Sequence, residues 1–246
     1  MEKSLIDANE SLSPEKRAAI ERSIGEIRKK IAIAEQKSPY GQKADLLLAT
    51  KTRTPEEINF AISLGVKHIG ENRVQELLEK YDFIQKDGIR LHFIGALQTN
   101  KVKYIIDKVD LIHSVDRLSL AKEIDRQAKK HGKVMDVLCE VNIGNEASKS
   151  GVRAEEAEEF IRELAKFENL RLCGLMAIPP VLENISTQKQ YFQKIMNLYI
   201  DISRKKIDNI CMGVLSIGMS SDYEIAVESG STLVRIGTAA FGARNY

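Results

Sequence analysis

The sequence predicts an α/β protein with a single TIM-type (β/α)8 barrel, in which a parallel sheet closes on itself and helices cover its outside. The first observation is that short apolar runs alternate with amphipathic helical segments from residue 44 to the end of the chain. The second is that each helical crossover returns the chain in the same direction, so the strands must run parallel. The third is length, because such a barrel commonly fills about 200 to 250 residues and the chain has 246. No Gly-x-Gly-x-x-Gly turn follows the first strand, which disfavours an open doubly wound sheet.

An amphipathic helix is predicted ahead of the barrel, over residues 14–34, because apolar residues recur there at three- and four-residue spacing. Ser13 directly precedes Pro14 and Glu15, which is a favourable start for a helix. We expect residues 1–40 to form a helical extension packed on the barrel. Because no composition shift or linker divides the chain, residues 1–246 are expected to form one domain.

Eight short apolar runs are the predicted barrel strands. Their near-continuous apolar character indicates that both faces of each strand are covered. In chain order they are residues 46–50, 67–69, 91–94, 111–114, 136–142, 170–175, 214–217 and 233–236.

Helices are expected between the strands, and three of them carry a capping residue at the start and a glycine at the end. The expected capping residues are Thr54, Asp116 and Ser221. Thr54 with Glu57, and Ser221 with Glu224, have the spacing of a capping box.

Composition excludes several classes of protein. With 43% hydrophobic residues and a net charge of +2, the chain is neither disordered nor charged enough to hold a nucleic acid. No signal peptide is found and no apolar run approaches the roughly 20 residues that cross a bilayer, so we expect a cytoplasmic protein without a membrane partner. The cysteines Cys139, Cys173 and Cys211 are odd in number and widely spaced. They are interpreted as reduced thiols in apolar surroundings, and no metal site is predicted.

Lys51 is the first candidate functional residue. Binding and catalytic groups of a barrel follow the carboxyl ends of the strands, and Lys51 directly follows the first apolar run. An amine at the mouth of an apolar barrel is desolvated, which lowers its pKa and favours attack on a carbonyl. Lys51 is therefore a Schiff-base candidate, and the alternative is a lysine that turns outward to solvent.

The ends of the last two strands predict an anion site. Gly218-Met-Ser-Ser-Asp follows the seventh strand, and Gly237 and Thr238 follow the eighth. Glycines let the backbone approach an oxyanion and hydroxyls donate to it, although two ordinary turns would have the same composition. Arg235 lies in the eighth apolar strand and needs a partner or a place facing the barrel mouth. A lysine, a phosphate cradle and an arginine around one barrel mouth fit pyridoxal 5'-phosphate.

These residues lie in motifs through which the sequence resembles the pyridoxal phosphate homeostasis protein family, single-domain relatives of the alanine racemase N-terminal barrel. The resemblance covers residues 46–246. Its motifs, in order, are LATKT (48–52), GENRVQE (70–76), HFIGALQTNK (92–101), GLMAIP (174–179), GMSSD (218–222) and VRIGTAAFG (234–242).

The resemblance implies a set of cofactor-binding residues. Lys51 matches the lysine that forms the covalent imine with pyridoxal 5'-phosphate, and Arg235 matches the arginine near its pyridine nitrogen. The matching phosphate ligands are Ser220, Gly237 and Thr238, and Asn72 matches a residue of the pocket wall. These roles are binding roles, and no catalytic residue is implied.

The implied function is storage, buffering or delivery of pyridoxal phosphate in the cell, without established turnover, with apoenzymes that use this cofactor as recipients. Related racemases continue into a β domain, whereas this sequence stops at Tyr246, directly after the last barrel motif, so no such domain is expected. A cationic arginine beside the ring nitrogen also weakens the ring as an electron sink. Two alternatives stay open: an amino-acid racemase or decarboxylase with the same cofactor, and a barrel hydrolase or aldolase that uses Lys51 without it.

The four histidines are expected to contribute little. His68, His92 and His113 lie in or beside predicted strands at unrelated spacings, and His131 ends a helix. None is predicted to contact the ligand.

Overall fold

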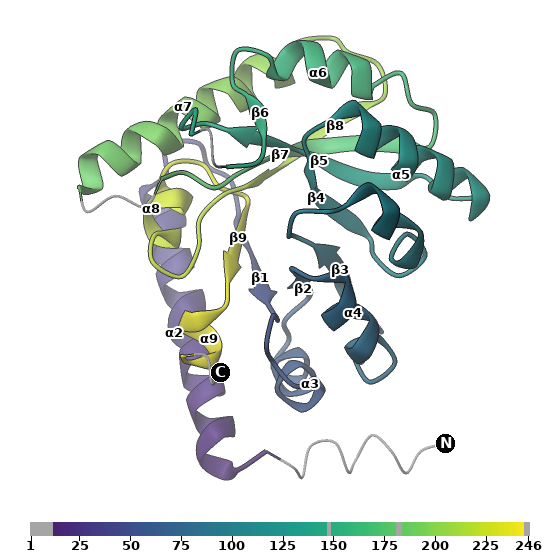
Figure 1. Ribbon diagram of the computed structural model, residues 1–246. Coiled ribbons are helices and arrows are strands. Elements are labelled where there is room, and N and C mark those ends of the chain that lie inside the picture. Colours follow the sequence, from purple (N-terminus) through teal and green to yellow (C-terminus); the bar gives the residue numbers. More distant parts are fainter. Residues whose placement is uncertain (1–11, 147–148, 181–183, 244–246) are drawn as a thin grey trace.

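The structure, a computed structural model, describes residues 12–146, 149–180 and 184–243. Eight parallel strands close into a barrel, because β1 pairs with both β2 and β9 and the chain of pairings runs on through β4 and β5. Figure 1 shows the helices arranged around the strands. The predicted (β/α)8 barrel is confirmed.

The barrel strands occupy the positions that the apolar runs predict, with ends that differ by a few residues. They are β1 (Asp45–Ala49), β2 (His68–Glu71), β3 (Arg90–Phe93), β4 (Leu111–Val115), β5 (Met135–Asn142), β7 (Leu170–Ala177), β8 (Ile210–Ser216) and β9 (Leu233–Ile236). The sequence patterns did not reveal β6 (Val152–Arg153), which pairs only with the end of β5.

Helices fill the connections between strands, and one more short helix follows β9. They are α3 (Pro55–Ser63), α4 (Val74–Tyr81), η1 (Thr99–Tyr104), α5 (Leu118–Lys130), α6 (Ala157–Leu164), α7 (Ile185–Ser203), α8 (Tyr223–Glu228) and α9 (Thr238–Phe241). In the described residues, no helix is long and apolar enough to span a membrane.

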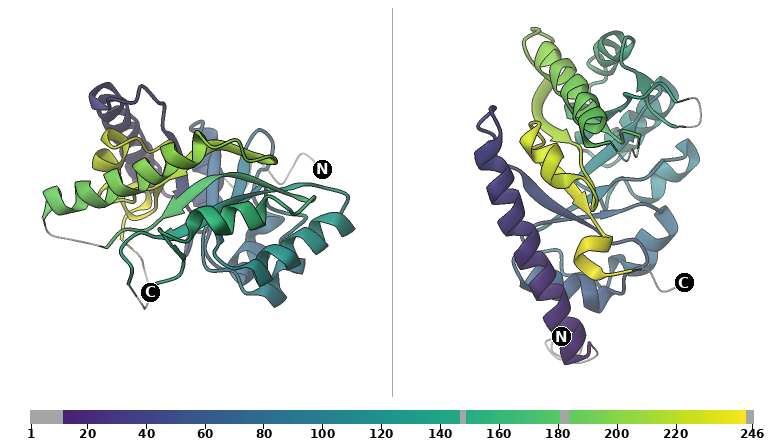
Figure 2. Two further views of the ribbon diagram at one scale, coloured as in Figure 1. Left: turned by 90° about the horizontal axis from the view of Figure 1, so that it is seen from above. Right: turned by 90° about the vertical axis from the view of Figure 1, so that its left-hand side faces the viewer.

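Helix α2 (Pro14–Lys37) lies along the outside of the barrel beside α8 and α9, as Figures 1 and 2 show from three directions. Ser13 caps it through a hydrogen bond from the backbone N–H of Lys16. Its buried stripe of Ile20, Ile24, Ile27, Ile31 and Ala34 joins the main core. The predicted extension over residues 1–40 is described from residue 12 onward, and its first 11 residues lie outside the described ranges.

Of the three predicted caps, one is confirmed and two are wrong. Thr54 and Glu57 form the capping box of α3, with both reciprocal hydrogen bonds present. Asp116 does not cap α5, because its carboxylate pairs with the neighbouring Arg117. Ser221 does not cap α8, because Asp222 takes the capping position without a side-chain cap bond.

The apolar core has two layers. The larger layer lies between the outer face of the barrel and the helices. Inside the barrel, one small cluster surrounds Leu47 and Ile94 and another surrounds Leu111, Leu138 and Met176. Because side chains alternate along a strand, every second residue of each strand points into this interior, and the residues that follow reach the carboxyl-end mouth.

Candidate functional site

A cavity of about 610 Å³ lies at the carboxyl ends of the strands. All of the sequence-predicted site residues line it, namely Lys51, Asn72, Ser220, Arg235, Gly237 and Thr238. The other lining residues are Ala49, Arg53, Ile94, Ile178, Met219, Ser221 and Ala239. The volume lies within the range of about 300 to 1,000 Å³ that is typical of small-molecule sites.

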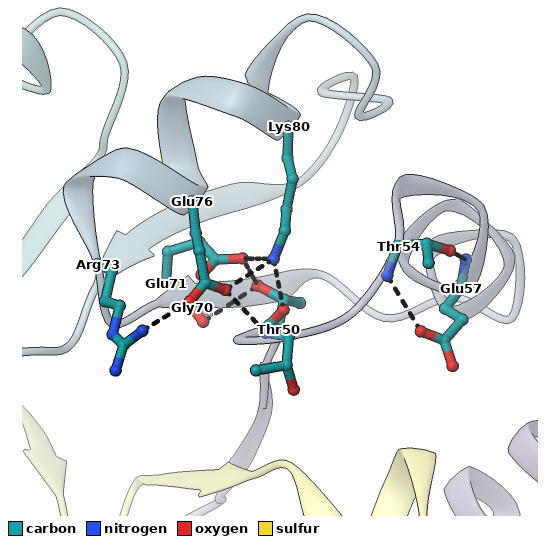
Figure 3. Close-up of polar contacts among 9 residues, drawn as sticks. Thr50, Thr54, Glu57, Gly70, Glu71, Arg73, Glu76 and Lys80 are labelled. Atoms are coloured by element: carbon teal, nitrogen blue, oxygen red, sulfur yellow. Dashed lines mark hydrogen bonds and ion pairs between the residues drawn. The ribbon is translucent and has the colours of Figure 1, made fainter. Parts of the chain in front are cut away.

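Lys51 lies in the turn between β1 and α3, and helix α4 holds this turn on both sides of the lysine. The Lys80 ammonium donates to the carbonyl of Thr50 (2.9 Å), and the N–H of Thr52 donates to the Glu76 carboxylate (2.8 Å). Thr52 has a φ of 62°, a left-handed conformation that a β-branched residue rarely adopts. The α4 contacts, drawn in Figure 3, therefore maintain a strained turn that carries the lysine.

The same contacts include a buried ion pair. Glu71, at the end of β2, is fully buried and accepts from Lys80 (2.9 Å) and from the Thr50 hydroxyl (2.7 Å) (Figure 3). Burial raises the pKa of Glu71, and the Lys80 charge opposes that rise. This pair connects β1, β2 and α4 directly behind the Lys51 turn.

Asn72 is positioned by a close backbone approach. A Cβ atom on Gly95 would lie 2.1 Å from the carbonyl oxygen of Asn72, so only glycine fits there. Within the described residues, the side-chain oxygen of Asn72 is buried and has no hydrogen-bond partner. This acceptor lies in a residue of the cavity wall.

Ser220 and the turn after β9 form a small set of donors at the cavity. The backbone N–H groups of Gly237 and Ala239 both donate to the Ser220 Oγ, each at a distance of 3.2 Å. An oxygen acceptor is therefore already held where two N–H groups converge. Thr238, between them, is exposed and lines the same cavity. This is the donor geometry that an oxyanion needs.

Arg235 is buried at the carboxyl end of β9, with 5% of its surface exposed. It donates to the carbonyl and to the hydroxyl of Ser216 (both 2.6 Å) and to the carbonyl of Ala177 (3.0 Å). These contacts use three of the five N–H groups of a guanidinium. Burial lowers the pKa of Arg235 to about 10, so it stays charged at neutral pH.

Two acidic groups act on Arg235, namely Glu140, on β5, and Asp222, and both oppose the fall of its pKa. Burial and the charge of Asp116 raise the pKa of Glu140 to about 7, although Arg235 and Arg117 oppose the rise. Its side chain is nearly buried, and it therefore changes charge near neutral pH.

The charge of the cavity is one-sided. Lys51, Arg53 and Arg235 line it, whereas none of its described lining residues is an aspartate or a glutamate. Such a cavity favours an anionic ligand.

Sequence reasoning missed Arg53 and the partners of Arg235. The Arg53 guanidinium donates to the Gly242 carbonyl (2.6 Å) at the end of α9, and so ties the Lys51 connection to the segment after β9. Its position two residues after Lys51 is the signal that could have identified it. The Ser216 hydroxyl, which contacts Arg235, also contacts His113 (3.2 Å), a residue expected to contribute little.

Comparisons with known proteins agree on one family. The family model for the alanine racemase N-terminal domain matches residues 24–245. A pyridoxal phosphate homeostasis protein of Aquifex aeolicus is 45% identical over 224 residues, which cover 91% of this chain and 97% of the relative. The Escherichia coli K12 protein of the same name is 37% identical over 234 residues, covering 92% of this chain and 97% of the relative.

Among solved structures, PipY of Synechococcus elongatus with PLP bound superposes with a TM-score of 0.78 at 26% identity, covering 91% of this chain and all of PipY (100%). An alanine racemase of Clostridium difficile, at 18% identity and a TM-score of 0.67, shares the fold over 89% of this chain and 57% of its own.

Proposed function

The chain belongs to the pyridoxal phosphate homeostasis protein family, and from that premise we propose that its cavity holds pyridoxal 5'-phosphate for storage and delivery. The observation that carries the proposal is the cationic cavity, which combines a lysine at the end of β1 with an oxyanion cradle after β8 and β9. The cofactor is a phosphate monoester with an aldehyde, and both groups match residues that line this cavity.

The proposed binding roles follow from the chemistry of each side chain. Lys51 supplies the amine that bonds covalently to the cofactor's aldehyde. The phosphate would be held by Ser220, Thr238 and the backbone N–H of Gly237, in the place where Ser220 Oγ now accepts two N–H groups. Arg235 would direct an N–H group at the pyridine nitrogen. Asn72 would contribute its unpartnered side-chain oxygen to the pocket wall.

The state of Arg235 supports a holding role over catalysis. When bound, the cofactor can supply an electron sink for carbanion chemistry, and this sink is strongest with a protonated ring nitrogen. Arg235 stays cationic at neutral pH. A cation in hydrogen-bonding position disfavours a second positive charge on the ring. We therefore propose that the protein does not turn over amino acids and releases its cofactor to apoenzymes that depend on pyridoxal phosphate.

The test of cofactor binding is spectroscopic. Protein purified with pyridoxal phosphate should be yellow, and borohydride reduction followed by peptide mapping should find the modification on Lys51. The Lys51→Ala variant should be colourless, whereas Lys129→Ala, at the exposed end of α5, serves as a matched control and should stay yellow. Modification on other lysines with Lys51 unmodified would refute the assignment.

A second experiment separates delivery from catalysis. Loaded protein mixed with a pyridoxal phosphate-dependent apoenzyme should restore that enzyme's activity, while the same protein alone racemises or decarboxylates no amino acid. Amino-acid turnover that disappears in Lys51→Ala would favour the racemase or decarboxylase alternative. Colourless protein that forms a reducible bond with sugar aldehydes would favour the aldolase alternative.

A further inference from the structure

Three histidines form a continuous row inside the barrel. His68 on β2, His92 on β3 and His113 on β4 come from neighbouring strands and point inward. His68 Nδ1 lies 3.0 Å from His92 Nε2, and His92 Nδ1 lies 2.9 Å from His113 Nε2. Each ring therefore contacts the next through a hydrogen bond between nitrogens.

The row extends to the proposed cofactor site at one end and to the opposite end of the barrel at the other. His113 Nδ1 lies 3.2 Å from the Ser216 Oγ, which lies 2.6 Å from the Arg235 guanidinium. At the far end, His68 Nε2 lies 3.7 Å from a carboxylate oxygen of Asp45, at the start of β1. The chain of contacts thus runs along the inside of the barrel.

The Arg235 end of the row sets a direction for its hydrogen bonds, and the Asp45 end is compatible with that direction. A guanidinium can only donate, so Arg235 donates to the Ser216 Oγ, and the Ser216 hydroxyl hydrogen is left to donate to His113 Nδ1. Each neutral ring then accepts at Nδ1 and donates at Nε2. The last donor, on His68, faces the Asp45 carboxylate, which can only accept when ionised. The reverse direction would put a bare ring nitrogen against that carboxylate.

This row of hydrogen bonds requires neutral rings, because an imidazolium has two donors and no acceptor. Burial lowers the pKa of all three histidines, most strongly for His92 and His113. Several charged groups act on the row. Arg235, Arg90 and Lys67 lower the pKa of one or more rings, and Asp45 and Asp110 raise that of the half-buried His68. The row is therefore neutral at neutral pH.

We propose that His68, His92 and His113 are positioning residues, a one-way hydrogen-bond chain that fixes the Ser216 hydroxyl and through it the orientation of the Arg235 guanidinium. The consequence for cofactor binding rests on the proposed function, whereas the chain and its effect on Arg235 can be tested without the cofactor. In a row of neutral rings, each hydrogen bond fixes the donor and acceptor of the next. Loss of one ring should therefore make the Arg235 guanidinium less ordered, although Arg235 lies on another strand.

The primary test uses the protein without cofactor and labelled with ¹⁵N. Nitrogen–nitrogen couplings should appear across the His68–His92 and His92–His113 hydrogen bonds, with all three rings protonated at Nε2. The Arg235 guanidinium should show slow rotation through separate nitrogen signals. Rings protonated at Nδ1, or an absence of couplings, would overturn the proposal.

Variants separate positioning from simple packing. His113→Leu should collapse the separate Arg235 nitrogen signals, and His113→Asn, which keeps an acceptor near the Ser216 hydroxyl, should retain them. The control is His131→Gln, at the exposed end of α5, which should change neither. If Arg235 is equally ordered in His113→Leu and wild type, the positioning role is wrong.

The loaded protein supplies a further readout. His113→Leu should shift the visible absorption of bound pyridoxal phosphate and raise its Kd about fivefold, which corresponds to about 1 kcal/mol. His113→Asn should keep the wild-type spectrum. An unchanged spectrum and Kd in His113→Leu would refute positioning while cofactor binding stands. Failure of wild-type protein to bind the cofactor would instead refute the proposed function. The nitrogen signals of the cofactor-free protein would still test whether the histidine row positions Arg235.

Discussion

Replacement of Glu140 by glutamine should make the stability of the protein less sensitive to pH between about 4.5 and 7. The pKa of Glu140 is raised from 4.5 to about 7, mainly by burial, so the folded state keeps a proton that the unfolded chain has already lost. Between these two values the folded state therefore becomes less stable as the pH rises. At 1.36 kcal/mol for each pKa unit, the full loss is about 3 kcal/mol.

The assay is urea unfolding of the cofactor-free protein at pH 5 and pH 8.5. At pH 5, where Glu140 is protonated in the folded state, wild type and Glu140→Gln should differ little, because the two side chains have nearly the same shape. At pH 8.5 the variant should be more stable by about 2 to 3 kcal/mol. A Glu168→Gln control, at an exposed position, should track wild type at both pH values. A Glu140→Gln difference that is the same at both pH values would refute the reasoning.

Three further outcomes are expected. Lys80→Met should destabilise the protein by about 3 kcal/mol in urea unfolding because it leaves Glu71 buried without its cation, and adding Glu71→Gln should recover part of the loss. Gly95→Ala should lower cofactor affinity more than about tenfold in a titration, because the added Cβ would strain the backbone at Asn72 by roughly 1 to 3 kcal/mol. The control Gly213→Ala, with open space around it, should leave the affinity unchanged. Below pH 6.5 the neutral histidine row should make stability fall as pH falls, and His92→Gln should flatten that slope by up to about 1.4 kcal/mol per pH unit in urea unfolding.

The strands could be predicted from sequence because a parallel barrel strand is apolar on both faces. The run around Leu47 and the run around Leu138 therefore stand out against the charged helices. Strand β6 could not be recognised, because two residues carry no periodicity. The caps at Asp116 and Ser221 failed for a local reason, since a carboxylate or hydroxyl in the right place can find another partner or turn away.

The candidate site was predictable to the extent that strand ends define it. Lys51, Ser220 and Gly237 follow strands, so a rule about strand ends selects them, and they line one cavity. The histidine row was not predictable in this way. His92 lies opposite Gly70 and Leu111 only because of the strand register, and no spacing along the chain encodes that register.

The two α4 contacts on either side of Lys51 have a thermodynamic consequence. Ordering one residue of backbone costs roughly 1 to 2 kcal/mol in conformational entropy, and at this turn folding meets that cost before any ligand arrives. Binding of a ligand to Lys51 would then cost little further backbone entropy at this turn, and its release would restore little. The backbone of this turn should therefore be nearly the same with and without ligand, so a protein that distinguishes the two states would have to recognise the ligand itself.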